Sequence, residues 1–290
     1  MNLHLLDDPA ALRSLIVDLL RRKCGDESLF RNEACDGVRS SSVMLLLGQK
    51  VLEDSGTSET CLILNKRSWR VRQAGDLCCP GGTMEGRLDG QLARLLTLPG
   101  SPLTRWPHWR RLRSQSPARA VLLSQLLATG LRESWEEMRL VPVWVRFLGP
   151  LPSQCLLAFR RVIHPMVGWV SRQKRFFPSW EVERIVWIPL RFLLHESRYA
   201  RYYLHVPPEL EKRLNRRSQD YPCFVHEDEG GRELLWGATF RIVTYLVNLL
   251  FGFRPPPLHS LPLITGVLDE GYVYGRDRET AAGGKNDQGR

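Results

Sequence analysis

The chain has 290 residues, enough for one large domain or two small ones with a sizeable buried core. Its composition, 43% hydrophobic and 25% charged, is typical of a globular protein and argues against wholesale disorder. The net charge of +10 favours anionic partners such as nucleotides, phosphates, RNA or acidic lipid, and it selects none of them.

Cysteine usage and apolar runs indicate a cytoplasmic protein. The seven cysteines are odd in number and show no C-x-x-C spacing, which argues against a disulfide framework and a zinc site. The first fifteen residues hold no basic stretch followed by an apolar run, so we expect no signal peptide. The longest apolar stretch, 234–251, contains Arg241 and predicts a buried helix rather than a membrane span.

The first elements in chain order are a helix and a pair of strands. Apolar residues at helical spacing over 9–22 follow two aspartates and a proline, and they predict a helix within an N-terminal extension, 1–38. Residues 42–48 and 60–68 predict two strands that could form a hairpin. A short strand then leads into the Pro-Gly-Gly turn that ends at Gly82.

The next segment, 87–116, is unusually basic. It contains prolines, many arginines and a single acid, Asp89, and it predicts a basic insertion with a short helix near 90–97. Ser116 and Pro117 then form a good helix start, and the helix should run to about residue 138 with Gly130 as a weak point.

Beyond residue 141 the pattern predicts mainly strands, followed by a closing helix that ends near 251. Strands around a central helix with a second helix near the end predict an α/β (α+β) sandwich with a mixed sheet. The main domain should cover 39–252. We expect order to fade in a C-terminal tail, 253–290, which is rich in proline and glycine and partly disordered.

Three glutamates cluster in the helix "LRESWEEMRL". Glu133, Glu136 and Glu137 lie three and four positions apart, so their carboxylates share one helix face. Their mutual repulsion must be offset by solvent, by Arg132 and Arg139, or by a hard divalent cation such as Mg²⁺. On these residues alone, a solvated acidic face is the favoured interpretation.

The segment as a whole reads R-E-x-x-E-E downstream of a Pro-Gly-Gly turn, and it resembles the signature of the Nudix hydrolase family. The positions that match are Gly82, Arg132, Glu133, Glu136, Glu137 and Leu140. The resemblance implies a Nudix-type α/β/α sandwich and a metal-dependent diphosphatase. It further implies that the three glutamates, helped by backbone near Gly82, hold Mg²⁺ or Mn²⁺. Arg132 would orient them, and Glu133 would double as general base.

The chain departs from the signature at three places. Leu88 stands where the loop acid belongs, with Asp89 one residue later and Glu85 three earlier. Some three dozen residues lie inserted before Arg132. Arg139 replaces the glycine that follows the glutamates, and arginine would be strained if that position requires positive φ.

The flanking segments resemble the coenzyme A diphosphatase branch of the family. Arg67 and Arg72 match its pattern before the glycines and could contact substrate phosphates. Coenzyme A or acyl-CoA is therefore the first expected substrate, and ADP-ribose-type compounds are the second. The alternative is a catalytically weak or inactive Nudix-fold protein that binds a nucleotide, or RNA through the insertion with Trp106 and Trp109 as stacking partners. The sequence does not set the oligomeric state.

Overall fold

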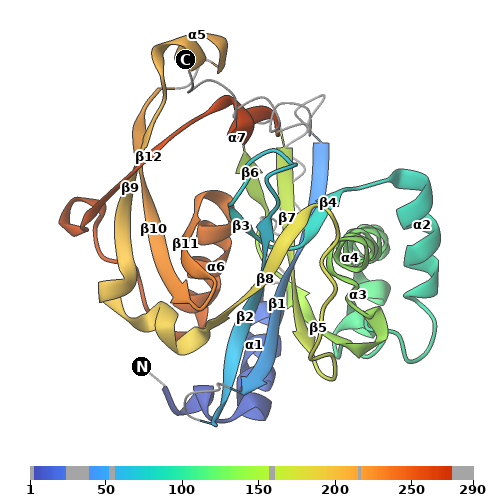
Figure 1. Ribbon diagram of the computed structural model, residues 1–290. Coiled ribbons are helices and arrows are strands. Elements are labelled where there is room, and N and C mark those ends of the chain that lie inside the picture. Colours follow the sequence, from blue (N-terminus) through green and yellow to red (C-terminus); the bar gives the residue numbers. More distant parts are fainter. Residues whose placement is uncertain (1–2, 24–38, 52–55, 157–160, 215–216, 276–290) are drawn as a thin grey trace, which may run out of the picture.

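The computed structural model describes residues 3–23, 39–51, 56–156, 161–214 and 217–275. A large mixed sheet forms the centre of the molecule, helices lie on both of its faces, and a smaller sheet lies to one side (Figure 1). The expected α/β arrangement of helices on either side of a mixed sheet is therefore confirmed.

The large sheet has the order β3-β2-β1-β7-β5, and three further strands extend it, with β4 on β1, β6 on β7 and β8 on β2. Strands β1 and β7 are parallel, and the other pairs are antiparallel. The expected β1–β2 hairpin pairing is present. The strand bounds are β1 Arg39–Val51, β2 Ser58–Arg67, β3 Leu77–Cys78, β4 Gly81–Thr83, β5 Val145–Pro150, β6 Gln154–Leu156, β7 Arg161–Val170 and β8 Val182–Pro189.

Strand β1 is buried on both faces, because alternate side chains of a strand point in opposite directions. Leu45 and Leu47 join one hydrophobic core, and Met44 and Leu46 join another. The first core is covered by α1 (Pro9–Lys23) and α6 (Gly237–Phe251), and the second by α4 (Pro117–Met138). Helix α1 thus packs into the same core as the sheet.

The second sheet has four strands in the order β11-β10-β9-β12, and α6 packs against β10 and β11. Its strands are β9 Tyr199–His205, β10 Gln219–Asp228, β11 Gly231–Trp236 and β12 Leu263–Val267, with the short helices α5 Pro208–Leu214 and α7 Glu270–Tyr274 nearby. Single 3-10 turns occur at η1 Leu3–Leu6, η3 Pro142–Trp144, η5 Leu190–Leu194, η6 Glu196–Arg198 and η7 Leu258–Ser260.

The prediction that order fades beyond residue 252 is wrong for residues 253–275. Strand β12 pairs in parallel with β9, and Arg201 opposes Leu263. Asp269 is the N-cap of helix α7, and its side chain accepts a hydrogen bond from the Tyr272 N–H at 2.6 Å. Composition gave no sign of this order, because β12 is stabilised by an edge of β9 some sixty residues earlier in the chain. Residues 276–290 lie outside the described part of the chain.

The basic insertion is folded against the second core. It contains α2 (Gly86–Leu95) and α3 (Trp109–Gln115), and both helices contact α4. Trp106 is only 2% exposed, and its indole N–H donates to the Leu148 carbonyl at 3.0 Å. Trp109 is also buried. The hypothesis that Trp106 and Trp109 stack on RNA bases is therefore wrong, because both rings are core residues.

Helix α4 runs without interruption through Gly130. A Cβ atom at this position would lie 2.9 Å from the Met44 sulfur, so the glycine permits close packing of α4 on β1. The closing helix, α6, ends at Gly252, which has a positive φ of 67°. Among the helices of the described segments, none has both the length and the apolar character that crossing a bilayer requires.

Candidate active site

Arg132 is the hub of an ion-pair network beneath the glutamates. Its Nε lies 2.8 Å from Asp89 Oδ1. Its Nη2 lies 3.1 Å from Glu133 Oε1, and its Nη1 lies 3.1 Å from Glu136 Oε2. Nη2 also donates to the Thr83 carbonyl at 3.3 Å. One buried guanidinium thus connects two of the predicted glutamates to β4 and to the insertion.

Asp89 occupies the other side of this network. It is fully buried and accepts hydrogen bonds from Thr129 Oγ1 at 2.8 Å and from the Glu85 N–H at 2.6 Å, in addition to Arg132. Asp89, which lies one residue after the expected position of the loop acid, is therefore an internal partner of Arg132. Leu88, its neighbour, is largely exposed.

Glu133 lies directly against the Pro-Gly-Gly turn. A Cβ atom on Gly82 would collide with the Glu133 carboxylate, so any other residue here would have to displace that carboxylate. Burial raises the pKa of Glu133; Arg132 partly offsets this, and Glu136 reinforces it. The fold thus places Gly82 against the glutamate helix.

Glu137 is the most deeply buried of the three glutamates. Its Oε2 accepts a hydrogen bond from Asn65 Nδ2 of β2 at 2.7 Å. Burial raises the pKa of Glu137 to about 8, with a further contribution from the charge of Glu133, while Arg67 and Asn65 act in the opposite direction. Glu137 can therefore exchange a proton near neutral pH when no cation is bound.

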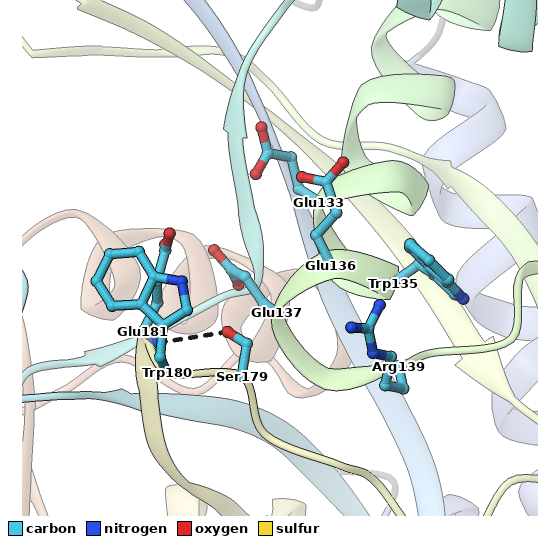
Figure 2. Close-up of a pocket in the computed structure, with 8 residues that line it drawn as sticks. All are labelled: Glu133, Trp135, Glu136, Glu137, Arg139, Ser179, Trp180 and Glu181. Atoms are coloured by element: carbon cyan, nitrogen blue, oxygen red, sulfur yellow. Dashed lines mark hydrogen bonds between the residues drawn. The ribbon is translucent and has the colours of Figure 1, made fainter.

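A pocket of about 450 Å³ opens over the C-terminal end of α4 and the start of β8 (Figure 2). The Ser179 N–H donates to the Glu137 carbonyl at 2.8 Å, which ties the segment before β8 to the helix. Glu181 belongs to that segment, and its charge acts on Glu137. The pocket is lined by Glu133, Trp135, Glu136, Glu137, Arg139, Ser179, Trp180 and Glu181.

Sequence reasoning did not identify two aromatic residues of this pocket, Trp135 and Trp180. Both are largely exposed, and Trp135 carries the Arg139 guanidinium 4.4 Å from its ring centroid. Trp135 lies inside the glutamate motif itself, where its exposure on a mostly buried helix could have been noticed from the helical periodicity. Trp180 gave no such signal, because it lies in a loop.

The two arginines predicted to contact substrate do not line the pocket. Arg67 is half-buried, and its Nε donates to the Arg72 carbonyl at 2.7 Å. Its charge still acts on Glu137, so it lies near the glutamates. The Arg72 side chain is exposed. Phosphate contacts by Arg67 and Arg72 stay a prediction.

The donor set of the pocket suits a hard divalent cation. Four carboxylates line it, and burial is the main cause of the raised pKa values of Glu133 and Glu137. In the segments that the structure describes, no three His, Cys, Asp or Glu side chains are arranged to hold a metal ion. Binding of a cation would therefore require glutamate side chains to rotate. Two of them, Glu133 and Glu136, already form ion pairs with Arg132.

Arg139 ends helix α4 in the left-handed conformation, with φ 55° and ψ 38°. The backbone strain expected for a positive φ at Arg139 is thus present, because the left-handed conformation costs a residue with a side chain about 1 kcal/mol. The N–H groups of Arg139 and Leu140 donate to the Trp135 and Ser134 carbonyls and close the helix.

We expect Arg139→Gly to be more stable than Arg139→Ala by about 1 kcal/mol. Both variants lose the contact with Trp135, so their difference isolates the backbone strain. At Arg241, an exposed position inside α6, the order should reverse, because glycine is about 1 kcal/mol worse than alanine in a helix interior. Urea denaturation of the four variants measures both differences. Equal stabilities of the two Arg139 variants would contradict the assignment of strain.

No family model matches the chain, and no curated protein matches it. Solved structures that align with it include a Nudix hydrolase from Nitrosomonas europaea, at 12% identity over 79% of this chain and 80% of that one, with a TM-score of 0.35. A Nudix hydrolase from Alicyclobacillus acidocaldarius aligns at 14% identity over 54% and 81%, with a TM-score of 0.35. The Nudix domain of Shewanella oneidensis NrtR, complexed with ADP ribose, aligns at 14% over 60% and 85%, with a TM-score of 0.33. Because these identities and TM-scores are low, the proposals below rest on the residues of this chain.

Proposed function

We propose that this protein is a Nudix-type hydrolase that cleaves the diphosphate linkage of a nucleoside diphosphate derivative with the help of Mg²⁺ or Mn²⁺. The observation that carries the proposal is the convergence of Glu133, Glu136, Glu137 and Glu181 on one pocket. Arg132 forms ion pairs with Glu133 and Glu136, and Gly82 lies against Glu133. A pocket dominated by carboxylates repels a diphosphate unless a cation neutralises it, which makes the metal a requirement of the proposal.

Each residue then has a defined role. Glu133, Glu136 and Glu137 would hold the cation, with backbone near Gly82 as a further ligand. When bound, the cation supplies charge neutralisation at the diphosphate and acidifies a bound water. Arg132 fixes the direction of Glu133 and Glu136 through its two ion pairs. A glutamate with a raised pKa, Glu133 or Glu137, accepts the proton of the attacking water, and Glu133 is the first candidate because it lies against the glycine turn.

Coenzyme A or an acyl-CoA is the first proposed substrate, and an ADP-ribose-type compound is the second. Both contain an adenosine diphosphate half, whose base can stack on an aromatic ring. Trp135 and Trp180 supply exposed rings in the pocket walls. Specificity between the two substrates would come from the group beyond the diphosphate.

The test is product release from coenzyme A, acetyl-CoA, ADP-ribose and a dinucleoside polyphosphate, each with Mg²⁺, with Mn²⁺ and with chelator. We expect turnover of at least one compound that depends on the cation, with two phosphate-bearing products. Folded protein that turns over none of them would overturn the proposal in favour of the alternative, an inactive nucleotide-binding protein. That alternative predicts binding of the same compounds without product.

A further inference from the structure

A second cavity, of about 940 Å³, is lined by five cationic side chains. These are Arg13, Arg105, Arg146, Arg172 and Lys174, and together with Trp144 they define what we call the basic hollow. None of its lining residues lines the glutamate pocket. The two cavities are therefore distinct but adjacent, since Gln173 Nε2 of the hollow donates to the carbonyl of Arg139, which lines the pocket, at 2.9 Å.

The basic hollow is assembled from segments that are far apart in the chain. Arg13 comes from α1, Arg105 from the insertion between α2 and α3, and Arg146 from β5, while Arg172 and Lys174 follow β7. These segments meet near the end of the large sheet where β5 begins (Figure 1). Folding thus gathers like charges that the sequence keeps apart. Four of the five residues are exposed, so solvent offsets part of their repulsion.

Protein carboxylates do not offset the repulsion among the five cations. No Asp or Glu lines the hollow, and in the described segments none of its five cations forms an ion pair with a carboxylate. Burial and the charge of Arg146 lower the pKa of Arg13, and the charge of Asp8 only partly counters this. The hollow therefore carries uncompensated positive charge.

Two of the cations are held in place by neighbouring groups. Arg105 Nη2 donates to the Val143 carbonyl at 2.8 Å and to the Val145 carbonyl at 3.3 Å, which leaves its Nη1 free of these contacts. The Arg13 guanidinium lies 4.8 Å from the ring centroid of the buried Trp169. Donors fixed in this way lose little further freedom on binding an anion, and guanidinium groups match phosphate oxygens.

The hollow also offers an aromatic surface, since Trp144 lines it and is 37% exposed. Its volume is that of a site for a small molecule rather than a groove that follows a long strand. We propose that the basic hollow binds a nucleoside polyphosphate, with the five cations on the phosphates and Trp144 against the base. This site is independent of the proposed diphosphatase activity.

The test is titration calorimetry of the full-length chain with ATP and with inorganic tripolyphosphate, in chelator so that no metal-dependent turnover occurs. We expect both ligands to bind, with affinities that fall as salt rises. The double variant Arg146→Gln/Arg172→Gln should weaken both ligands by about tenfold or more. The matched control Arg110→Gln/Arg113→Gln removes the same charge from exposed positions on α3, and it should change affinity by less than about twofold.

A second variant separates the base contact from the phosphate contacts. Trp144→Ala should weaken ATP by about fivefold or more and leave tripolyphosphate unchanged. Absence of ATP binding to the wild type, or equal losses in the two double variants, would overturn the site. If Trp144→Ala weakens neither ligand, the nucleoside part of the proposal is wrong. Binding of a single-stranded RNA oligonucleotide but not of ATP would replace the proposal with a nucleic-acid surface.

Discussion

Glu137→Gln should reduce metal-dependent turnover by at least about a hundredfold, since it removes a charged ligand without changing the size of the side chain. Glutamine can still accept the hydrogen bond from Asn65, so the packing around β2 is retained. Glu136→Gln, at the more exposed rim of the pocket, should also lose metal-dependent turnover. The measurement is kcat and KM on the best substrate of the panel, with Mg²⁺ at saturation.

The Glu137→Gln variant should be more stable than the wild type at high pH in chelator. Burial raises the pKa of Glu137 to about 8 in the folded protein, well above its value in an unfolded chain. A raised pKa means that the folded state prefers the protonated carboxyl. The stability associated with this group is complete below the unfolded pKa and is lost as pH rises through 8. At pH 9 Glu137→Gln should therefore gain about 2 kcal/mol or more, and at pH 4 it should gain nothing.

Opposite effects on activity and stability exclude simple misfolding as the cause of lost turnover. Glu209→Gln, on the exposed side of the short helix α5, is the matched control and should change neither quantity. Unaltered turnover and metal dependence in Glu136→Gln and Glu137→Gln would show that the glutamates are not the metal site. A loss of stability in Glu137→Gln at pH 9 would contradict the assigned burial of a charged carboxylate.

The glutamate face could be predicted because helical periodicity is local information. Spacing alone placed Glu133, Glu136 and Glu137 together, and α4 presents all three at the pocket or its rim. The contact of Glu133 with Gly82 could be expected only through the family resemblance, because it joins two elements fifty residues apart. The pocket depends equally on Glu181, whose position follows from the docking of the loop before β8.

The insertion shows where composition misleads. Its many arginines and prolines suggested a basic insertion whose tryptophans could stack on RNA bases, yet Leu103, Trp106 and Trp109 are buried in the core beside α4. Their spacing of three residues was a sign of an apolar face, and the surrounding charges concealed it. The same mistake affected the tail, because strand β12 depends on its pairing with β9 rather than on its own composition.

Asp89 is the residue whose role depends most on the fold, and Asp89→Ala should destabilise the protein by about 3 kcal/mol or more. The substitution leaves the Arg132 guanidinium buried without the partner on its Nε side, and it also leaves the Glu85 N–H without its side-chain acceptor. Thr129 Oγ1 keeps only the Gln125 carbonyl as an acceptor, at 3.0 Å. Glu85→Ala is the control, because its exposed side chain does not cap α2, and it should cost less than about 0.5 kcal/mol. Urea denaturation at neutral pH measures both values.

A second substitution shows whether the cost comes from the unpaired charge. In Asp89→Ala combined with Arg132→Met the buried cation is gone, so the double variant should be more stable than Asp89→Ala alone. Its turnover should stay low, because Glu133 and Glu136 have lost the group that directs them. If Asp89→Ala lowers the free energy of unfolding by less than about 1 kcal/mol, Asp89 and Arg132 do not behave as a buried ion pair. The insertion would then contribute to this site only through the packing of α2 on α4.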